Sequence, residues 1–336
     1  MVTVVAVASS PLPPLSVMRT LTAWRFAPGV VAVAGGLVGG YGAGVRRWQA
    51  SGKGPWPRSR TWCFGLGVLV LLLVGCSFVG VYDDTLFWVR AVQNIVLLMV
   101  VPMFLAVGAP LTLFASAVSP PVRTRLSRVL HSRPAVLVTL PLVVTVVLVV
   151  PILVLYMSPI YEATLRDPVV SGVAGTALAV AGFVYFWTRF RIDPTPRPGS
   201  HLVTLAITIV EVVGDAVLGV VVWLGPLIAA GFYTALNRQW GPDPRTDQLL
   251  GAGVLWVGGD VVGLPFIGIV LARMVREDEE HARIVDAVLD RGDAGPASAG
   301  AEELPGAGAA AEPGTAAGRL WWEDDPQLAD RFRHPR

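Results

Sequence analysis

Apolar stretches of about 20 residues recur along this chain and constrain its fold more than any other feature. A helix needs about 20 consecutive apolar residues to cross the hydrocarbon core of a bilayer. With 54% hydrophobic and 15% charged residues, the chain is predicted to be an all-α, polytopic membrane protein, a bundle of seven transmembrane helices. The seven predicted spans are residues 27–45, 62–81, 86–113, 134–157, 169–187, 202–224 and 249–274.

Basic residues are distributed unevenly among the segments that connect these spans. Residues 46–60 contain five Arg and Lys and no acid, and residues 123–133 and 189–197 are also rich in arginine. The alternate segments are poorer in basic residues, apart from the one with Arg238 and Arg245. Among them, the acidic segment 82–84 and the mixed-charge segment 158–168 are expected to form outside turns. Because cytoplasmic segments carry the excess of Arg and Lys, we predict that the N-terminus lies outside and the C-terminus lies in the cytoplasm.

The remaining segments flank a predicted membrane domain, residues 23–275. Residues 1–22 lack the basic start of a signal peptide and are predicted to form a flexible N-terminal leader. Residues 276–291 have the apolar spacing of an amphipathic cytoplasmic helix. Residues 292–336 are rich in Ala, Gly and Pro, so we expect a disordered cytoplasmic tail, whose Trp321 and Trp322 are candidates for docking.

Several functional classes find no support in the sequence. No basic run with interleaved aromatic residues suggests nucleic-acid binding. We find no nucleophile–base set, phosphate-binding glycine loop or cluster of metal ligands, so we predict that the chain is not an enzyme and has no catalytic residues. Cys63 and Cys76 share one apolar stretch and are interpreted as core residues. Met99 and Met103 are weak candidates for Cu(I) ligands, because Met pairs at helical spacing usually pack in the core.

Polar and ionisable residues within or beside the spans are the strongest functional signal, because such residues are costly in lipid. An ionised acid in the membrane either takes up a proton or finds a cation. We therefore expect Arg90 to pair with a carboxylate, for which Glu211, Asp215 and Asp260 are the candidates. The predicted polar cavity is lined by Arg90, Gln93, Asn94, Asp167, Glu211, Asp215, Asp247, Gln248 and Asp260.

These polar residues allow two interpretations. In the first, they satisfy one another and form a buried polar lock between helices. In the second, they line a hydrophilic cavity, open to the outside, that holds an ion, a proton or a polar group of a partner. A small-solute or ion/proton transporter would use Glu211, Asp215 and Asp260 as a relay beside Arg90. Such a transporter is one of two functions that we consider for this chain.

Five segments, in their order and spacing, resemble one known family. They are LFWVRAVQNIVLLMVVPMFLAVGAPLTL, SPIYEATLRDP, DAVLGVVVW, FYTALNRQWGPDPRTDQLLGAGVLWVGGD and REDEEHARIVD. The chain is similar over residues 23–290 to the CtaG-type (Caa3_CtaG) cytochrome c oxidase assembly factors, which are implicated in supplying copper to the oxidase. The resemblance implies a multi-pass protein of the bacterial plasma membrane that contacts lipid and oxidase subunits and assists the biogenesis of this respiratory enzyme.

The chain departs from the family at the positions of its histidines. The third span of the family typically begins with a histidine, a glutamine and a second histidine. The corresponding residues here are Arg90, Gln93 and Asn94. The resemblance makes copper a possible cofactor. If the histidines of the family bind copper, however, a divergent member that lacks them is expected to bind it poorly or not at all. Such a member acts through protein contacts, with an Arg90–carboxylate pair in place of the metal. Asp167, Ser171, Gly175 and Asp215 stand at the other histidine positions, whereas Asp247, Gln248 and Asp260 fit the family pattern.

Overall fold

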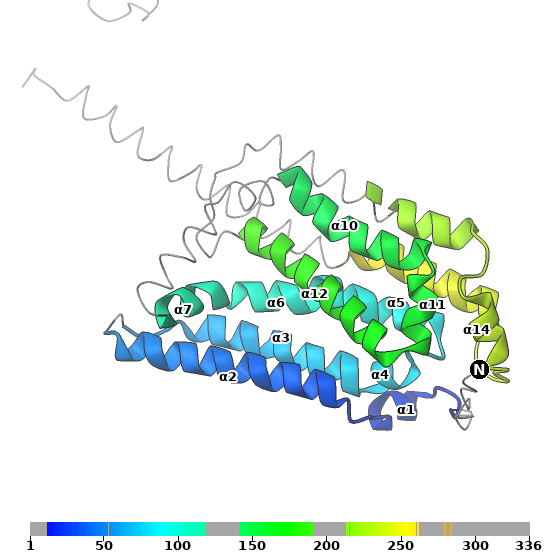
Figure 1. Cartoon of the computed structure of the whole chain (residues 1–336), viewed down its shortest axis with the longest axis horizontal. Helices are drawn as coiled ribbons and strands as arrows, with labels where there is room; N and C mark the ends of the chain where they lie inside the picture. Colours follow the sequence, from blue (N-terminus) through cyan, green and yellow to red (C-terminus); the bar gives the residue numbers. More distant parts are fainter. Residues whose placement is uncertain are drawn as a thin grey trace, which may run out of the picture. The chain divides into compact units, whose positions relative to one another are not determined.

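The computed structural model places most of the first three quarters of the chain. It describes residues 12–52, 54–118, 141–190, 213–214, 216–259, 261, 279 and 283. All regular structure in these residues is helical (Figure 1), which confirms the all-α class for the part of the chain that is described. The chain divides into two compact units, residues 1–272 and 273–336. The predictions for residues 1–11 and 292–336, and for nearly all of 276–291, lie outside the described residues.

Four helices among the described residues are long and apolar enough to cross a membrane. A fifth span is present if α10 (Pro141–Met157) and α11 (Ile160–Arg166), which meet at an angle of 73°, are counted as one. These spans correspond to the first five predicted ones. The sixth and seventh predicted spans are described only in part, so the count of seven and the orientation stay predictions. The four spans are α2 (Pro28–Ala50), Arg58–Tyr82, Phe87–Val107 and α12 (Pro168–Phe190).

The second of these spans is broken near its end. Helix α3 (Arg58–Cys76) stops at Ser77, whose backbone is extended, and the short helix α4 (Phe78–Tyr82) follows. The Ser77 side chain accepts a hydrogen bond from the Val79 N–H at 3.4 Å, as an N-cap residue does. A turn at residues 83–85 follows α4, in which the N–H groups of Thr85 and Leu86 donate to the Tyr82 carbonyl, and it places Asp83 beside the start of the next helix.

The third span is a helix with a π-helical segment in its middle. Helix α5 (Phe87–Ile95) continues through the π-helical residues Val96–Val100 into α6 (Val101–Val107). Pro102 has no N–H to donate to the Leu98 carbonyl, which favours such an irregularity. A Cβ on Gly182 of α12 would overlap the Leu98 carbonyl, so the two helices cross in close contact.

The predicted third span, residues 86–113, is longer than the observed one. Ala109 adopts a left-handed conformation with φ of 51°, and Pro110 begins a separate helix, α7 (Pro110–Ala117). Proline favours the first turn of a helix and disrupts a helix interior. The apolar sequence continues past Val107, but the helix ends there, and this is why the predicted span is too long.

Two further segments differ from the sequence-based expectation. Residues 12–22, assigned to a flexible leader, include helix α1 (Val17–Thr22), and the Tyr82 hydroxyl donates to the Pro13 carbonyl at 2.9 Å. The segment after α10, expected to be an outside turn, contains α11. Mixed charge in a segment of this length does not distinguish a turn from a short amphipathic helix.

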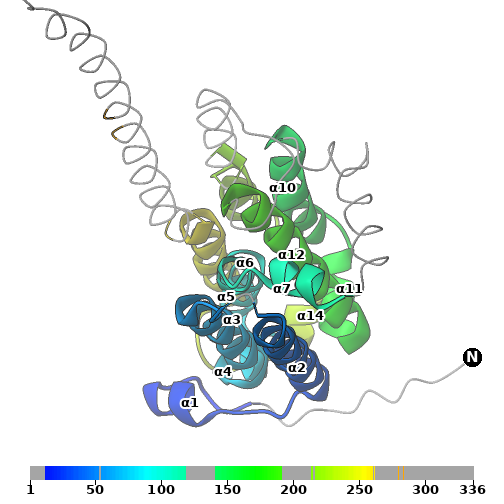
Figure 2. The same ribbon diagram turned by 90° about the vertical axis from the view of Figure 1, so that its left-hand side faces the viewer.

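The third span lies in the middle of the bundle. Helix α3 packs against α6 on one side, α12 packs against α6 and against the π-helical segment, and α10 packs against α12. Helix α2 packs against α3 and α7, and Figure 2 shows this arrangement from one end of the bundle. Residues 216–224 and 244–259 are also helical, and the short α14 (Ala230–Ala235) lies between them in the sequence. The polar residues Arg90, Gln93 and Asn94 of α5 are buried, so they face the interior of the bundle.

Candidate functional site

Arg90 forms a buried ion pair in the first turns of α5. Its Nη1 donates to Asp83 Oδ2 at 3.0 Å, and both side chains are 6% exposed. A buried guanidinium needs an opposite charge, because burial removes its hydration. Arg90 thus pairs with a carboxylate, and that carboxylate is Asp83, which the sequence assigns to an outside turn. Glu211, Asp215 and Asp260 lie outside the described residues, and so the transporter relay stays a prediction.

The Arg90 guanidinium also joins three helices. Its Nη1 donates to Gln93 Oε1 at 3.2 Å, and its Nη2 donates to the Thr164 carbonyl at 3.3 Å and to Ser171 Oγ at 2.8 Å. Gln93 completes the network because its Nε2 donates to Asp83 Oδ2 at 2.9 Å. Thr164 lies on α11 and Ser171 on α12. The network therefore fixes the position of α5 relative to both of these helices.

Two charged residues extend this network towards the surface. Arg25 donates from Nη2 to Asp83 Oδ2 at 3.3 Å and from Nε to the Gly75 carbonyl at 3.4 Å, and its side chain is 44% exposed. The Asp84 side chain is exposed, yet enough protein surrounds it that desolvation, together with the charge of Asp83, raises its pKa. Two arginines, Arg25 and Arg90, and two aspartates, Asp83 and Asp84, thus lie together at this end of the bundle.

Asn94 connects α5 to α10. Its Nδ2 donates to the Tyr156 hydroxyl at 3.0 Å, and both residues are buried. The Tyr156 ring packs beside Phe87 and Tyr161, with ring centroids 5.8 and 5.0 Å away. The side chain at this presumptive ligand position therefore serves as a hydrogen-bond donor within the core.

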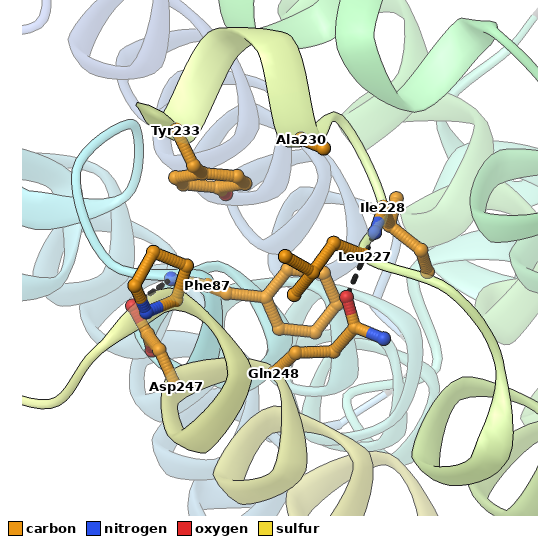
Figure 3. A pocket seen from close by; sticks show the side chains of 8 residues that line it. Phe87, Leu227, Ile228, Ala230, Tyr233, Asp247 and Gln248 are labelled. Carbon is orange, nitrogen blue, oxygen red and sulfur yellow. Dashed lines mark hydrogen bonds between the residues drawn. The ribbon is translucent and has the colours of Figure 1, made fainter. Parts of the chain in front are cut away.

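Asp247 caps the N-terminus of α5, as Figure 3 shows in part. Its Oδ2 accepts from the Phe87 N–H at 3.1 Å and its Oδ1 accepts from the Trp88 N–H at 3.0 Å. Arg238 donates from Nη2 to Oδ2 at 3.1 Å. Burial raises the pKa of the Asp247 carboxyl, and the two backbone N–H groups and Arg238 oppose this rise. Asp247 thus binds the start of α5 to the helix that contains residues 244–259.

Gln248 holds the chain that leads into α14. Its Oε1 accepts from the Ile228 N–H at 2.8 Å, and its Nε2 donates to the carbonyls of Val222 and Pro226 at 2.8 and 2.9 Å. Figure 3 shows Gln248 and Asp247 on the same helix, beside a small pocket of about 10 Å³. A pocket of this size holds about one water molecule. Asp247 and Gln248 therefore hold neighbouring segments of the chain in place beside Phe87, which also lines this pocket.

Asp167 is an N-cap residue of α12. Its Oδ1 accepts from the N–H groups of Val169 and Val170 at 2.7 and 3.4 Å, and its side chain is exposed. Helix α12 begins here because Pro168 suits the first helical position and Asp167 provides the acceptor. Of the residues assigned to one cavity, the structure brings together Arg90, Gln93 and Asn94, while Asp167, Asp247 and Gln248 serve elsewhere.

A large open cavity begins at the Arg90 network and extends between α2 and α12. We call it the α2–α12 cavity, and its volume is about 1780 Å³. Arg25, Asp83 and Asp84 line it in addition to the three residues expected from the sequence. The sequence could have indicated Asp83 as a partner of Arg90, because two consecutive acids, Asp83 and Asp84, precede the span that contains this arginine.

The candidate copper ligands belong to the apolar core. Met99 is buried beside Ile95 and Leu98, and Met103 packs against the same cluster. Among the described residues, no group of three His, Cys, Asp or Glu side chains lies close enough to hold a metal ion. At the presumptive ligand position, Arg90 is a cation already paired with Asp83. The groups around Arg90, which are a carboxylate, an amide and a hydroxyl, do not fit Cu(I), which prefers thiolate, thioether and imidazole ligands.

Comparison with known proteins gives one family and several relatives. The model of the Cytochrome c oxidase caa3 assembly factor family (Caa3_CtaG) matches residues 39–277. Uncharacterized proteins of Mycobacterium bovis and Mycobacterium tuberculosis are each 26% identical over 282 residues, which is 82% of this chain and 42% of the relative. An uncharacterized protein of Mycobacterium leprae is 26% identical over 280 residues. The chain spans less than half the length of these relatives, and no solved structure matches it significantly.

Proposed function

Because the chain belongs to the Caa3_CtaG family of cytochrome c oxidase caa3 assembly factors, we propose that it assists oxidase biogenesis through contacts with oxidase subunits in the membrane. The family match over residues 39–277 carries this proposal. The several long apolar helices support it, since a factor that handles membrane subunits works within the same bilayer. The chain would span the plasma membrane seven times, with its N-terminus outside, and would perform no chemistry of its own.

The contacts of Arg90 support a role without bound copper. Arg90 shares a carboxylate with Arg25 and donates to three further acceptors. A protonated guanidinium has no lone pair to offer a metal. Its charge also repels a cation. The network holds α5, α11 and α12 in fixed positions relative to one another. A rigid arrangement of this kind suits a protein that presents a stable surface to the oxidase subunits.

Oxidase activity in a deletion strain tests this function. Membranes from a strain that lacks the gene are expected to lose most of their cytochrome c oxidase activity, because unassembled subunits do not form the active enzyme. Expression of the wild-type chain from a plasmid should restore the activity. The assay follows oxidation of reduced cytochrome c, and the haem absorption of the same membranes reports the amount of assembled enzyme.

A second respiratory enzyme in the same membranes, such as succinate dehydrogenase, provides the control. Its activity should be the same in the deletion and wild-type strains. Normal oxidase activity in the deletion strain would contradict the proposed function, as would an equal loss of both enzymes.

A further inference from the structure

The α2–α12 cavity opens between two candidate membrane spans. Helix α2 packs against α3 and α7, whereas α12 packs against α6, α10 and α11. Residues of α3, α6 and α7 also line the cavity, among them Phe64, Leu105 and Leu113. Its lining is therefore mostly apolar, and its two sides are helices that would meet lipid or another protein in the bilayer.

The length of the cavity matches the thickness of a membrane. Its lining residues on α2 run from Pro28 to Arg47, which is roughly 28 Å at the rise of an α-helix. The hydrocarbon core of a bilayer is about 30 Å thick. One lipid molecule reaches through about half of this thickness, whereas a transmembrane helix crosses all of it. The length favours a helix as the occupant.

Small residues leave room for a second helix backbone along this cavity. Gly36, Gly40 and Gly44 follow one another at four-residue spacing on α2, and Gly172 lies on α12; all four line the cavity. A Cβ at Gly36, Gly40 or Gly172 would meet no atom within 4 Å. In membranes, small residues four positions apart allow another helix to approach closely.

The charges of the cavity have the distribution expected around a transmembrane helix. Arg25, Asp83, Asp84 and Arg90 lie at one end, and Arg47 lies at the other end of α2. The glycines and apolar residues lie between these ends. Since a transmembrane helix is apolar in its middle and carries its polar residues at its ends, it complements this lining.

We propose that the α2–α12 cavity is a docking site for one transmembrane helix of a partner protein. The helix is apolar over about 20 residues and carries small residues on the face that meets α2. That the partner is an oxidase subunit rests on the function proposed above, whereas the site for a helix does not.

Leucine substitutions on α2 provide a matched test. Gly40→Leu places a side chain in the cavity, whereas Gly39→Leu places one outside it; neither glycine has an atom within 4 Å of an added Cβ. Gly40→Leu is expected to reduce the amount of oxidase membrane subunit that copurifies from mildly solubilised membranes by about tenfold, equivalent to a loss of about 1.4 kcal/mol. Gly39→Leu should leave it unchanged. If the subunit copurifies with the wild type and in equal amount with both variants, measured at equal thermal stability, the proposal is overturned.

Photo-crosslinking identifies the occupant directly. A benzoylphenylalanine placed at Val173, which lines the cavity from α12, is expected to give an adduct whose peptide maps to an apolar segment of about 20 residues in another membrane protein. Adducts with lipid alone, or with a second copy of this chain, would overturn the proposal.

The same experiments separate this inference from the proposed function. An adduct within a transmembrane segment of a different membrane protein, together with normal oxidase activity in the deletion strain, supports the docking site and contradicts the oxidase role. Loss of oxidase activity in the deletion strain, together with lipid adducts alone, supports the oxidase role and overturns the docking site.

Discussion

Replacing Arg90 with methionine is expected to lower the free energy of unfolding by about 3 kcal/mol or more, because the change leaves Asp83 as a buried charge without its closest partner. Arg25 remains 3.3 Å from Asp83 and compensates part of this loss, but its side chain is 44% exposed. The Thr164 carbonyl and Ser171 also lose the donor that they share. Unfolding in detergent by heat or denaturant measures the effect.

Two further variants show whether the loss of stability in Arg90→Met comes from the broken ion pair with Asp83. Arg166→Ala removes an exposed pair with Glu162, whose side chain is 39% exposed, and should change the stability by about 0.5 kcal/mol or less. The double variant Arg90→Met/Asp83→Leu removes both charges, and it should recover much of the stability because hydrophobic residues often replace a buried ion pair without loss. If Arg90→Met alone is as stable as the wild type, the network does not have the role assigned to it.

Removal of the Asp247 side chain is the second change with a large expected effect. Asp247→Ala deletes the acceptor for the N–H groups of Phe87 and Trp88 and the partner of Arg238. Loss of an N-cap costs about 1 kcal/mol, and a buried arginine left without its carboxylate adds more, so a loss of about 3 kcal/mol is expected. Hydrogen exchange should increase in the first turn of α5.

A control for Asp247 lies just before the helix that contains it. Asp243 accepts from the N–H groups of Arg245 and Thr246, and its side chain is exposed. Asp243→Ala should therefore destabilise the protein less than Asp247→Ala and leave exchange in α5 unchanged. The account of Asp247 fails if the two variants lose equal stability, or if exchange in α5 stays at the wild-type rate.

Apolar composition predicted the positions of the first five candidate spans well because it is a local property. The stretches around α2, α12 and the third span need no tertiary information, since about 20 apolar residues are enough to identify each. Their ends were less predictable. Pro110 and Ser77 divide apolar sequence into separate helices, and a residue count over a window does not register a single proline or an extended serine.

The site was predictable only where its residues are neighbours in the sequence. Arg90, Gln93 and Asn94 are within one turn of each other and were expected to act together. Asp83 lies in a turn, as the sequence predicts, but its ion pair with Arg90 was not predicted, because the sequence does not show how this turn lies against α5. The cap that Asp247 provides for α5 joins residues 160 positions apart. No periodicity in the sequence indicates such a contact.

Copper content after exposure to Cu(I) tests most directly the proposal that the chain acts without bound copper. Purified protein is incubated with Cu(I) under anaerobic conditions, desalted and analysed for metal, beside the variant Met99→Ala/Met103→Ala. We predict that wild type and variant retain equally little copper, well below one equivalent. One equivalent of copper retained by the wild type and lost from the variant would contradict the account.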